Sequence, residues 1–284
     1  MGDSNLNEFE NRMRNDPRCD EELISAALRH ASDDDLYWDV VWILHRRDTP
    51  EVLNRARQLC QSPLCAERRL GADILGQLGV PERTFPKECM AILLQALHEE
   101  KDAEVLSASL IALGHLHEDE AIEPAAQLCR HPNPGVRHGV VSALTGYEDQ
   151  RAIETLIGLS KDEDADVRDW ATFGLGTQIN VDTPTLREAL AERLNDVDLV
   201  TRCEAIVGLA RRGDRRTIPA LSKELSSDCV DVLAVEAAEI IASPELYPHL
   251  IALRERWDGD ETLLARAITA CSNFASRDNA IVRQ

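Results

Sequence analysis

Bases are scarce in this 284-residue sequence, and acids are abundant. The 31 Lys and Arg residues oppose 51 Asp and Glu residues, which leaves a formal net charge of −20. A protein this acidic repels phosphate backbones and anionic membrane surfaces, and it attracts basic proteins. We therefore expect a basic protein as the partner, and neither nucleic acid nor a membrane. Solubility alone is the alternative reason for the charge.

The sequence also lacks the short motifs of most enzymes and metal sites. Its eight cysteines contain no C-x-x-C pair. Neither a Walker-type glycine loop, nor a dinucleotide fingerprint, nor a G-x-S-x-G motif is present. We expect no catalytic residues, no cofactor and no metal. No apolar run is long enough to span a bilayer or to direct secretion, so the expected location is the cytoplasm.

What the sequence does contain is an internal repeat. Leu113, Leu144 and Leu175 are separated by 31 residues, and a valine stands eight residues before each of them: Val105, Val136 and Val167. A period of this length is typical of stacked units that cannot bury their apolar face alone. Each unit has the pattern of two helices joined by a polar turn. The sequence predicts an all-α, right-handed α-solenoid of about eight helical hairpins.

The repeats fill nearly the whole chain. We expect an N-terminal polar segment over residues 1–20, with a composition compatible with a helix, and a single repeat array over residues 21–284. First helices are expected to begin near Glu21, Glu51, Lys87, Ala121, Ala152, Pro184, Thr217 and Pro248. Second helices are expected to begin near Asp35, Ala66, Ala103, Gly135, Ala165, Leu199, Asp231 and Glu261. Three turn acids are predicted to cap second helices, namely Asp164, Asp196 and Asp228.

Two segments carry the repeat most clearly: NPGVRHGVVSALTG (133–146) and DADVRDWATFGLG (164–176). They resemble the short HEAT repeats named after phycobilisome lyases, whose pattern is an acidic turn, Val-Arg, alanines and Leu-Gly. Residues 65–79 and 196–210 are looser copies. The resemblance implies the fold. It does not select a function, because that family includes scaffolds, lyase subunits, inhibitors and a few enzymes.

Two His-Glu pairs invite comparison with a metalloenzyme. The pairs His98-Glu99 and His117-Glu118 resemble those with which deoxyhypusine hydroxylases, a HEAT-type family, hold two irons. In that family the pairs stand at equivalent helical positions. Here His98 is predicted to end a first helix and His117 to end a second helix. The mismatch predicts that this chain binds no metal.

The second helices line the concave side in HEAT arrays, so their polar and aromatic residues are candidates for binding a partner. These candidates are Trp38, Asp39, Trp42, Arg168, Asp169, Trp170, Arg202, Glu204, Glu236 and Glu239. Tryptophan and arginine are enriched in the energetic hot spots of interfaces. The alternative is structural. The tryptophans would pack in the core, and the arginines would form a ladder with the turn acids.

These features favour a non-catalytic solenoid that captures a basic protein. Small acidic proteins of this kind resemble bacterial immunity proteins, which are inhibitors that neutralise basic nuclease toxins. The alternative is an enzyme subunit, or a scaffold like the chromophore lyases that holds a tetrapyrrole. A coloured or metal-containing protein would favour the alternative, and co-purification with a basic protein would favour capture.

Overall fold

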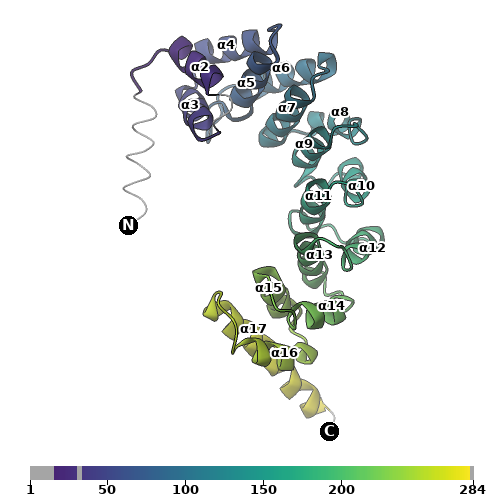
Figure 1. Cartoon of the computed structure of the whole chain (residues 1–284). Helices are drawn as coiled ribbons and strands as arrows, with labels where there is room; N and C mark the ends of the chain where they lie inside the picture. Colours follow the sequence, from purple (N-terminus) through teal and green to yellow (C-terminus); the bar gives the residue numbers. More distant parts are fainter. Residues whose placement is uncertain (1–15, 31–33, 282–284) are drawn as a thin grey trace. The chain divides into compact units, whose positions relative to one another are not determined.

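The computed structural model describes residues 16–30 and 34–281 and consists of helices, with no strand among these residues. Its contacts divide the chain into two compact units, an N-terminal unit (Met1–Leu144) and a C-terminal unit (Thr145–Gln284). Within each unit, successive helices form hairpins (Figure 1). The predicted α-solenoid fold class is confirmed. Among the described residues, no helix combines the length and the apolar character that crossing a membrane requires.

The N-terminal unit contains four hairpins. Their first helices are α2 (Asp20–Arg29), α4 (Pro50–Cys60), α6 (Pro86–Glu99) and α8 (Ile122–Ala126), the last preceded by a 3-10 turn (Asp119–Ala121). Their second helices are α3 (Asp34–Arg47), α5 (Cys65–Gln77), α7 (Ala103–Leu116) and α9 (Pro134–Leu144). Helices α3, α5, α7 and α9 pack against one another in that order, so the second helices form one layer.

The C-terminal unit repeats this plan. Its first helices are α10 (Gln150–Leu159), α12 (Pro184–Arg193), α14 (Thr217–Glu224) and α16 (Tyr247–Leu253), with a 3-10 turn (Pro244–Leu246) before α16. Its second helices are α11 (Ala165–Thr177), α13 (Leu199–Arg211), α15 (Val232–Ile241) and α17 (Glu261–Ile281). Here too the second helices pack side by side in one layer, as the teal to yellow part of Figure 1 shows.

Every predicted helix start lies within two residues of the observed one. Among the described residues, aspartate side chains cap five second helices by accepting hydrogen bonds from backbone N–H groups of the first turn: Asp102, Asp164, Asp198, Asp231 and Asp260. These bonds satisfy donors that have no partner inside the helix. The cap predicted at Asp164 is confirmed. The caps predicted at Asp196 and Asp228 are wrong, because Asp198 and Asp231 stand at the actual helix starts.

The repeat leucines form the core of the array. Leu113, Leu144 and Leu175 are fully buried, and the valines eight residues before them are buried as well. Burying a leucine side chain contributes about 1.5–3 kcal/mol relative to leaving it in water. Because no hairpin encloses its own leucine, neighbouring hairpins must stack, which explains the constant period.

Candidate functional site

In the N-terminal unit, three predicted partner-binding residues lie on α3. Trp42 is 41% exposed, and the Arg46 guanidinium lies 5.8 Å from the centre of its ring. Asp39 is exposed. Trp38 is half-buried and meets the edge of the Tyr37 ring at a centroid distance of 5.3 Å. The alternative of a tryptophan core stripe therefore does not describe Trp42.

A polar cluster under Trp38 ties α3 to α5. The Tyr37 hydroxyl donates a 2.6 Å hydrogen bond to Asp73, and the Arg69 guanidinium lies 3.6 Å from the same carboxylate. Burial raises the pKa of Asp73, although the Tyr37 bond and the Arg69 charge oppose the rise. Burial also raises the pKa of Tyr37. These groups satisfy one another, which indicates a structural link between the two helices.

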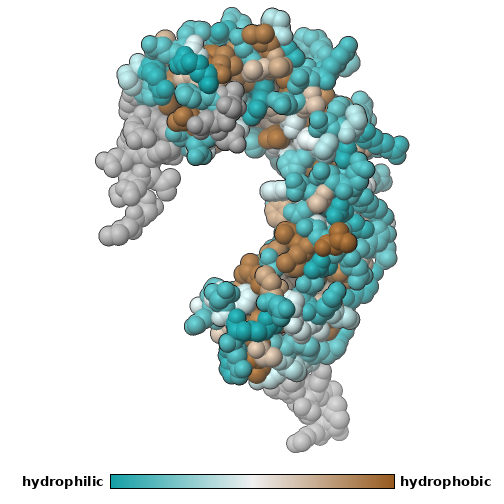
Figure 2. Space-filling view, viewed as in Figure 1, coloured by the Kyte–Doolittle hydropathy of each residue, from teal (hydrophilic) through white to brown (hydrophobic). Residues whose placement is uncertain are grey.

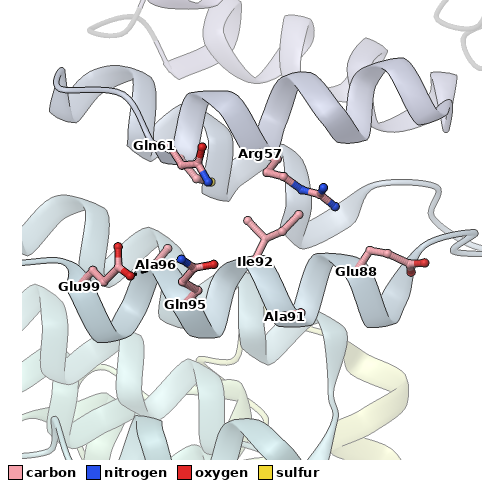
Figure 3. Close-up of a pocket in the computed structure, with 9 residues that line it drawn as sticks. Arg57, Gln61, Glu88, Ala91, Ile92, Gln95, Ala96 and Glu99 are labelled. Atoms are coloured by element: carbon pink, nitrogen blue, oxygen red, sulfur yellow. Dashed lines mark hydrogen bonds between the residues drawn. The ribbon is translucent and has the colours of Figure 1, made fainter.

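A groove of about 450 Å³ runs between α4 and α6 (Figure 3). Figure 3 shows Arg57 on α4 and Gln61, the residue after α4, opposite Ile92 and Gln95 on α6. Gln95 donates a 3.3 Å hydrogen bond to Glu99 within its own helix. The groove is open to solvent, and both polar and apolar side chains line it. The lining residues do not form the arrangement of a nucleophile and a base, or of an acid and a base, that catalysis requires.

In the C-terminal unit, the two predicted arginines are engaged within the protein. Arg168 binds Asp196 with two hydrogen bonds, and Arg202 donates a 2.8 Å hydrogen bond to Glu224. Each guanidinium also reaches a carbonyl oxygen six residues earlier, at Asp162 and at Asp196 respectively. Both side chains therefore link neighbouring hairpins, as the alternative of a structural ladder describes.

Three other predicted residues come together on successive second helices. We call Asp169 on α11, Glu204 on α13 and Glu236 on α15 the acidic row. Glu204 is central. Its residue is only 9% exposed, and its Oε2 atom has no hydrogen-bond partner among the described residues. The Oδ1 atom of Asp169 is likewise buried without a described partner.

The electrostatics of the acidic row reflect this crowding. Burial raises the pKa of Glu204 to about 7, and the charges of Asp169, Glu236 and Asp231 add to the rise. Burial also raises the pKa of Asp169 to about 6, with smaller contributions from Asp198 and Asp166. Burial of an oxygen that accepts no hydrogen bond, together with like charges nearby, destabilises the ionised form of a carboxylate.

Two arginines, Arg211 and Arg266, bind acids on or beside the acidic row. Arg211 lies 3.9 Å from Glu236 and donates a 3.0 Å hydrogen bond to the carbonyl of Thr177. Glu239, the last of the predicted residues, accepts hydrogen bonds of 2.8 and 3.1 Å from Arg266 on α17. The Glu239 carboxylate is thus paired with an arginine, whereas the part of the chain that the structure describes offers no hydrogen bond or ion pair to Glu204.

Exposed apolar side chains lie on the same helices as the acidic row and in the turn before α13. Trp170, which is 48% exposed, follows Asp169 on α11 and meets the edge of the Phe173 ring at 5.6 Å. Sequence reasoning missed further exposed apolar residues in this unit, among them Val197, Val200, Val232 and Ile240. Figure 2 shows hydrophobic surface where Figure 1 draws α13 and α15. Val197 is 92% exposed in a polar turn, and such a valine is the signal that could have revealed this surface.

The described residues include no group of three or more His, Cys, Asp or Glu side chains that could hold a metal ion. Two of the histidines considered above lie at helix ends. His98 is in the last turn of α6, and His117 adopts a left-handed backbone conformation at the end of α7. The two sites are therefore not equivalent positions of related repeats.

Comparisons with known proteins agree with this architecture. The chain is 26% identical to Protein YibA of Escherichia coli K12 over 227 residues, which cover 78% of this chain and 80% of that protein. The crystal structure of Escherichia coli YibA has a TM-score of 0.73 at 24% identity, covering 95% of this chain and 96% of that one. Importin beta has a TM-score of 0.52 at 14% identity, covering 94% of this chain and 43% of importin beta. These structures share the fold.

A family model assigns the repeats. The model described as HEAT repeats matches residues 90–176 and 154–242, which together span more than half of the chain. The matched segments include both sequence segments that carry the repeat pattern most clearly. This protein belongs to the family of HEAT-repeat proteins.

Proposed function

We propose that this protein is a non-catalytic binding solenoid that captures a basic protein partner. The observation that carries the proposal is the acidic row on α11, α13 and α15, together with the exposed apolar side chains of Trp170, Val200 and Val232 on the same three helices. A surface that combines buried acids with exposed apolar side chains is complementary to a partner that presents cationic and apolar groups together.

The net charge of −20 supports the same proposal. Opposite charges steer two proteins toward each other and raise the association rate by orders of magnitude at low salt. The stacked helices hold the binding groups on regular secondary structure, so little conformational entropy is lost when a partner docks. Fast capture through a preformed surface suits an inhibitor. We therefore propose a bacterial immunity protein that neutralises a basic nuclease toxin in the cytoplasm.

The experiment begins with the product of the neighbouring gene. The two proteins are co-expressed, this chain is purified by an affinity tag, and the bound material is identified by mass spectrometry. We expect a strongly basic protein to co-purify, and we expect the association rate to fall steeply between about 50 and 500 mM salt because of screening. Binding that is as fast at high salt as at low salt would contradict electrostatic capture.

The competing hypothesis is tested on the same material. An enzyme subunit or a chromophore-lyase-like scaffold would carry a tetrapyrrole, whose visible absorption is measurable in the purified protein. Stoichiometric absorption of that kind, or turnover of a small molecule, would replace the inhibitor proposal. If the captured protein is a nuclease, its activity on plasmid DNA should disappear at one equivalent of this protein.

A further inference from the structure

We propose that the acidic row is the receptor for one arginine side chain of the partner, with the guanidinium bound to the Glu204 carboxylate and the arginine stem lying against Trp170. The inference rests on the proposed function and specifies the chemistry by which the partner would be recognised. The other acids of the row, Asp169 and Glu236, flank the guanidinium from the neighbouring helices.

The Glu204 carboxylate is not satisfied by hydrogen bonds within the described residues. Glu204 is nine-tenths buried, and its Oε2 atom has no described hydrogen-bond partner. A buried polar atom without a partner loses its bonds to water and gains nothing in return. The nearby Arg211 donates a hydrogen bond to the Thr177 carbonyl and lies 3.9 Å from Glu236. Among the described residues, Glu204 therefore has no direct cationic partner, and Arg211 acts on it only through its charge.

The shape of the acidic row favours an organic cation over a metal ion. Among the described residues, no three acidic, histidine or cysteine side chains are grouped closely enough to hold a metal ion. A guanidinium is larger, planar and carries five N–H donors, so it can bond Glu204 and still interact with carboxylates on either side. The row thus suits an arginine better than an inorganic ion.

Trp170 lies on α11, the helix that packs against α13 with Glu204. Trp170 stands six residues after its helix cap Asp164, and Glu204 stands six residues after Asp198, so the two occupy equivalent places on adjacent helices. Trp170 is 48% exposed. Arginine stacks on indole rings through its planar charge and its apolar stem. Lysine, with a compact ammonium group, would gain less from this arrangement.

Binding of a guanidinium should be linked to the protonation of Glu204. The charged groups that face Glu204 are Asp169 from α11, Asp231 and Glu236 from α15, and Arg211 from its own helix. Burial and the three acids raise the pKa of Glu204 to about 7, so near neutral pH about half of the molecules carry a proton there. A bound guanidinium favours the ionised form. Binding should therefore release a proton and become tighter as the pH rises from about 6 to 8.

The test uses the full chain and hexa-arginine amide as the probe. Isothermal titration at pH 7 in two buffers of different ionisation enthalpy gives both the affinity and the number of protons released. We expect wild type to release about half a proton from Glu204. Glu204→Gln should lose that release and bind about tenfold more weakly, the scale of one charge-assisted hydrogen bond. Hexa-lysine amide should bind wild type more weakly than hexa-arginine amide does.

Glu255→Gln is the matched control, because Glu255 is an exposed acid of the same unit and its replacement removes the same charge. We expect it to behave as wild type. Equal affinity and equal proton release for wild type and Glu204→Gln would overturn the arginine receptor, as would an equal loss in Glu255→Gln. In that case capture of a basic protein would still stand on its own test, which is co-purification with the neighbouring gene product.

Discussion

Arg168 and Asp196 join two hairpins of the C-terminal unit through a pair of hydrogen bonds. The Nε and Nη2 atoms of Arg168 donate to the two carboxylate oxygens of Asp196 at 2.9 and 3.0 Å. Arg68 binds Glu100 in the same way in the N-terminal unit, at 2.6 and 3.1 Å. In both cases the third nitrogen reaches a carbonyl oxygen six residues earlier in the chain. The arginine four residues into the second helix therefore links neighbouring hairpins in both cases.

Arg168→Ala should destabilise the protein by about 2–3 kcal/mol, because charge-assisted bidentate pairs are among the stronger hydrogen bonds and the change leaves the buried Asp196 with fewer partners. Urea unfolding followed by circular dichroism measures the loss. Arg254→Ala is the control, since the Arg254 side chain is exposed. A loss of stability no larger in Arg168→Ala than in Arg254→Ala would show that the Arg168–Asp196 pair does not stabilise the packing of the two hairpins.

The acidic row should make stability depend on pH. The pKa of Glu204 is raised from 4.5 to about 7, so the folded protein binds more protons than the unfolded chain between these values. Stability therefore falls as the pH rises through this window, and the cost of the ionised carboxylate is complete above it. Glu204→Gln removes a cost of about 3 kcal/mol at pH 8, at about 1.36 kcal/mol per pKa unit, and almost none at pH 4.5.

Thermal unfolding at pH 4.5 and pH 8 measures this effect. We expect Glu204→Gln to melt at a higher temperature than wild type at pH 8 and at a similar temperature at pH 4.5. Glu255→Gln should differ little from wild type at either pH, because Glu255 is exposed. A Glu204→Gln variant that gains no stability at pH 8 would mean that the Glu204 carboxylate finds a partner in solution.

Helices α11 and α13 approach each other at two glycines. A Cβ atom added at Gly208 would lie 2.6 Å from the Cα of Gly176, a contact that backbone atoms cannot relieve locally. Gly208→Ala should therefore cost about 1–3 kcal/mol by overpacking. Gly158→Ala is the opposite case, because α10 leaves that position open, with no heavy atom within 4 Å of the added Cβ. That variant should gain up to about 1 kcal/mol from helix propensity. Equal urea midpoints for the two variants would contradict the close approach.

The helices could be predicted because their signals are local. Pro50, Pro86 and Pro184 begin first helices, and an aspartate before α7 and α11 caps a second helix. The core leucines could be identified because they recur every 31 residues. Two caps were placed wrongly for a physical reason. The turn before α13 offers both Asp196 and Asp198, and their roles differ because Arg168 and Arg193 bind Asp196 while Asp198 caps the helix.

The acidic row was predictable only as separate residues. Asp169 and Glu236 stand five residues after their caps, whereas Glu204 stands six after its cap, so the three do not share one column of the repeat. Their proximity depends on how the helices stack. The exposed valines were missed because valine in a repeat is usually a core residue, and Val200 and Val232 face solvent only because they occupy the first turns of α13 and α15.

Trp170 should act on dissociation rather than on stability. Because it is 48% exposed, Trp170→Ala should change the free energy of unfolding by less than about 1 kcal/mol. As an aromatic anchor beside the acidic row, it should raise the dissociation rate of the captured basic protein by roughly tenfold or more while the association rate stays within about twofold. Surface plasmon resonance at several salt concentrations separates the two rates. The control is Tyr247→Ala on α16, an exposed aromatic residue of the same unit that lies in the layer of first helices. An unchanged dissociation rate in Trp170→Ala, or the same increase in Tyr247→Ala, would place the binding surface elsewhere.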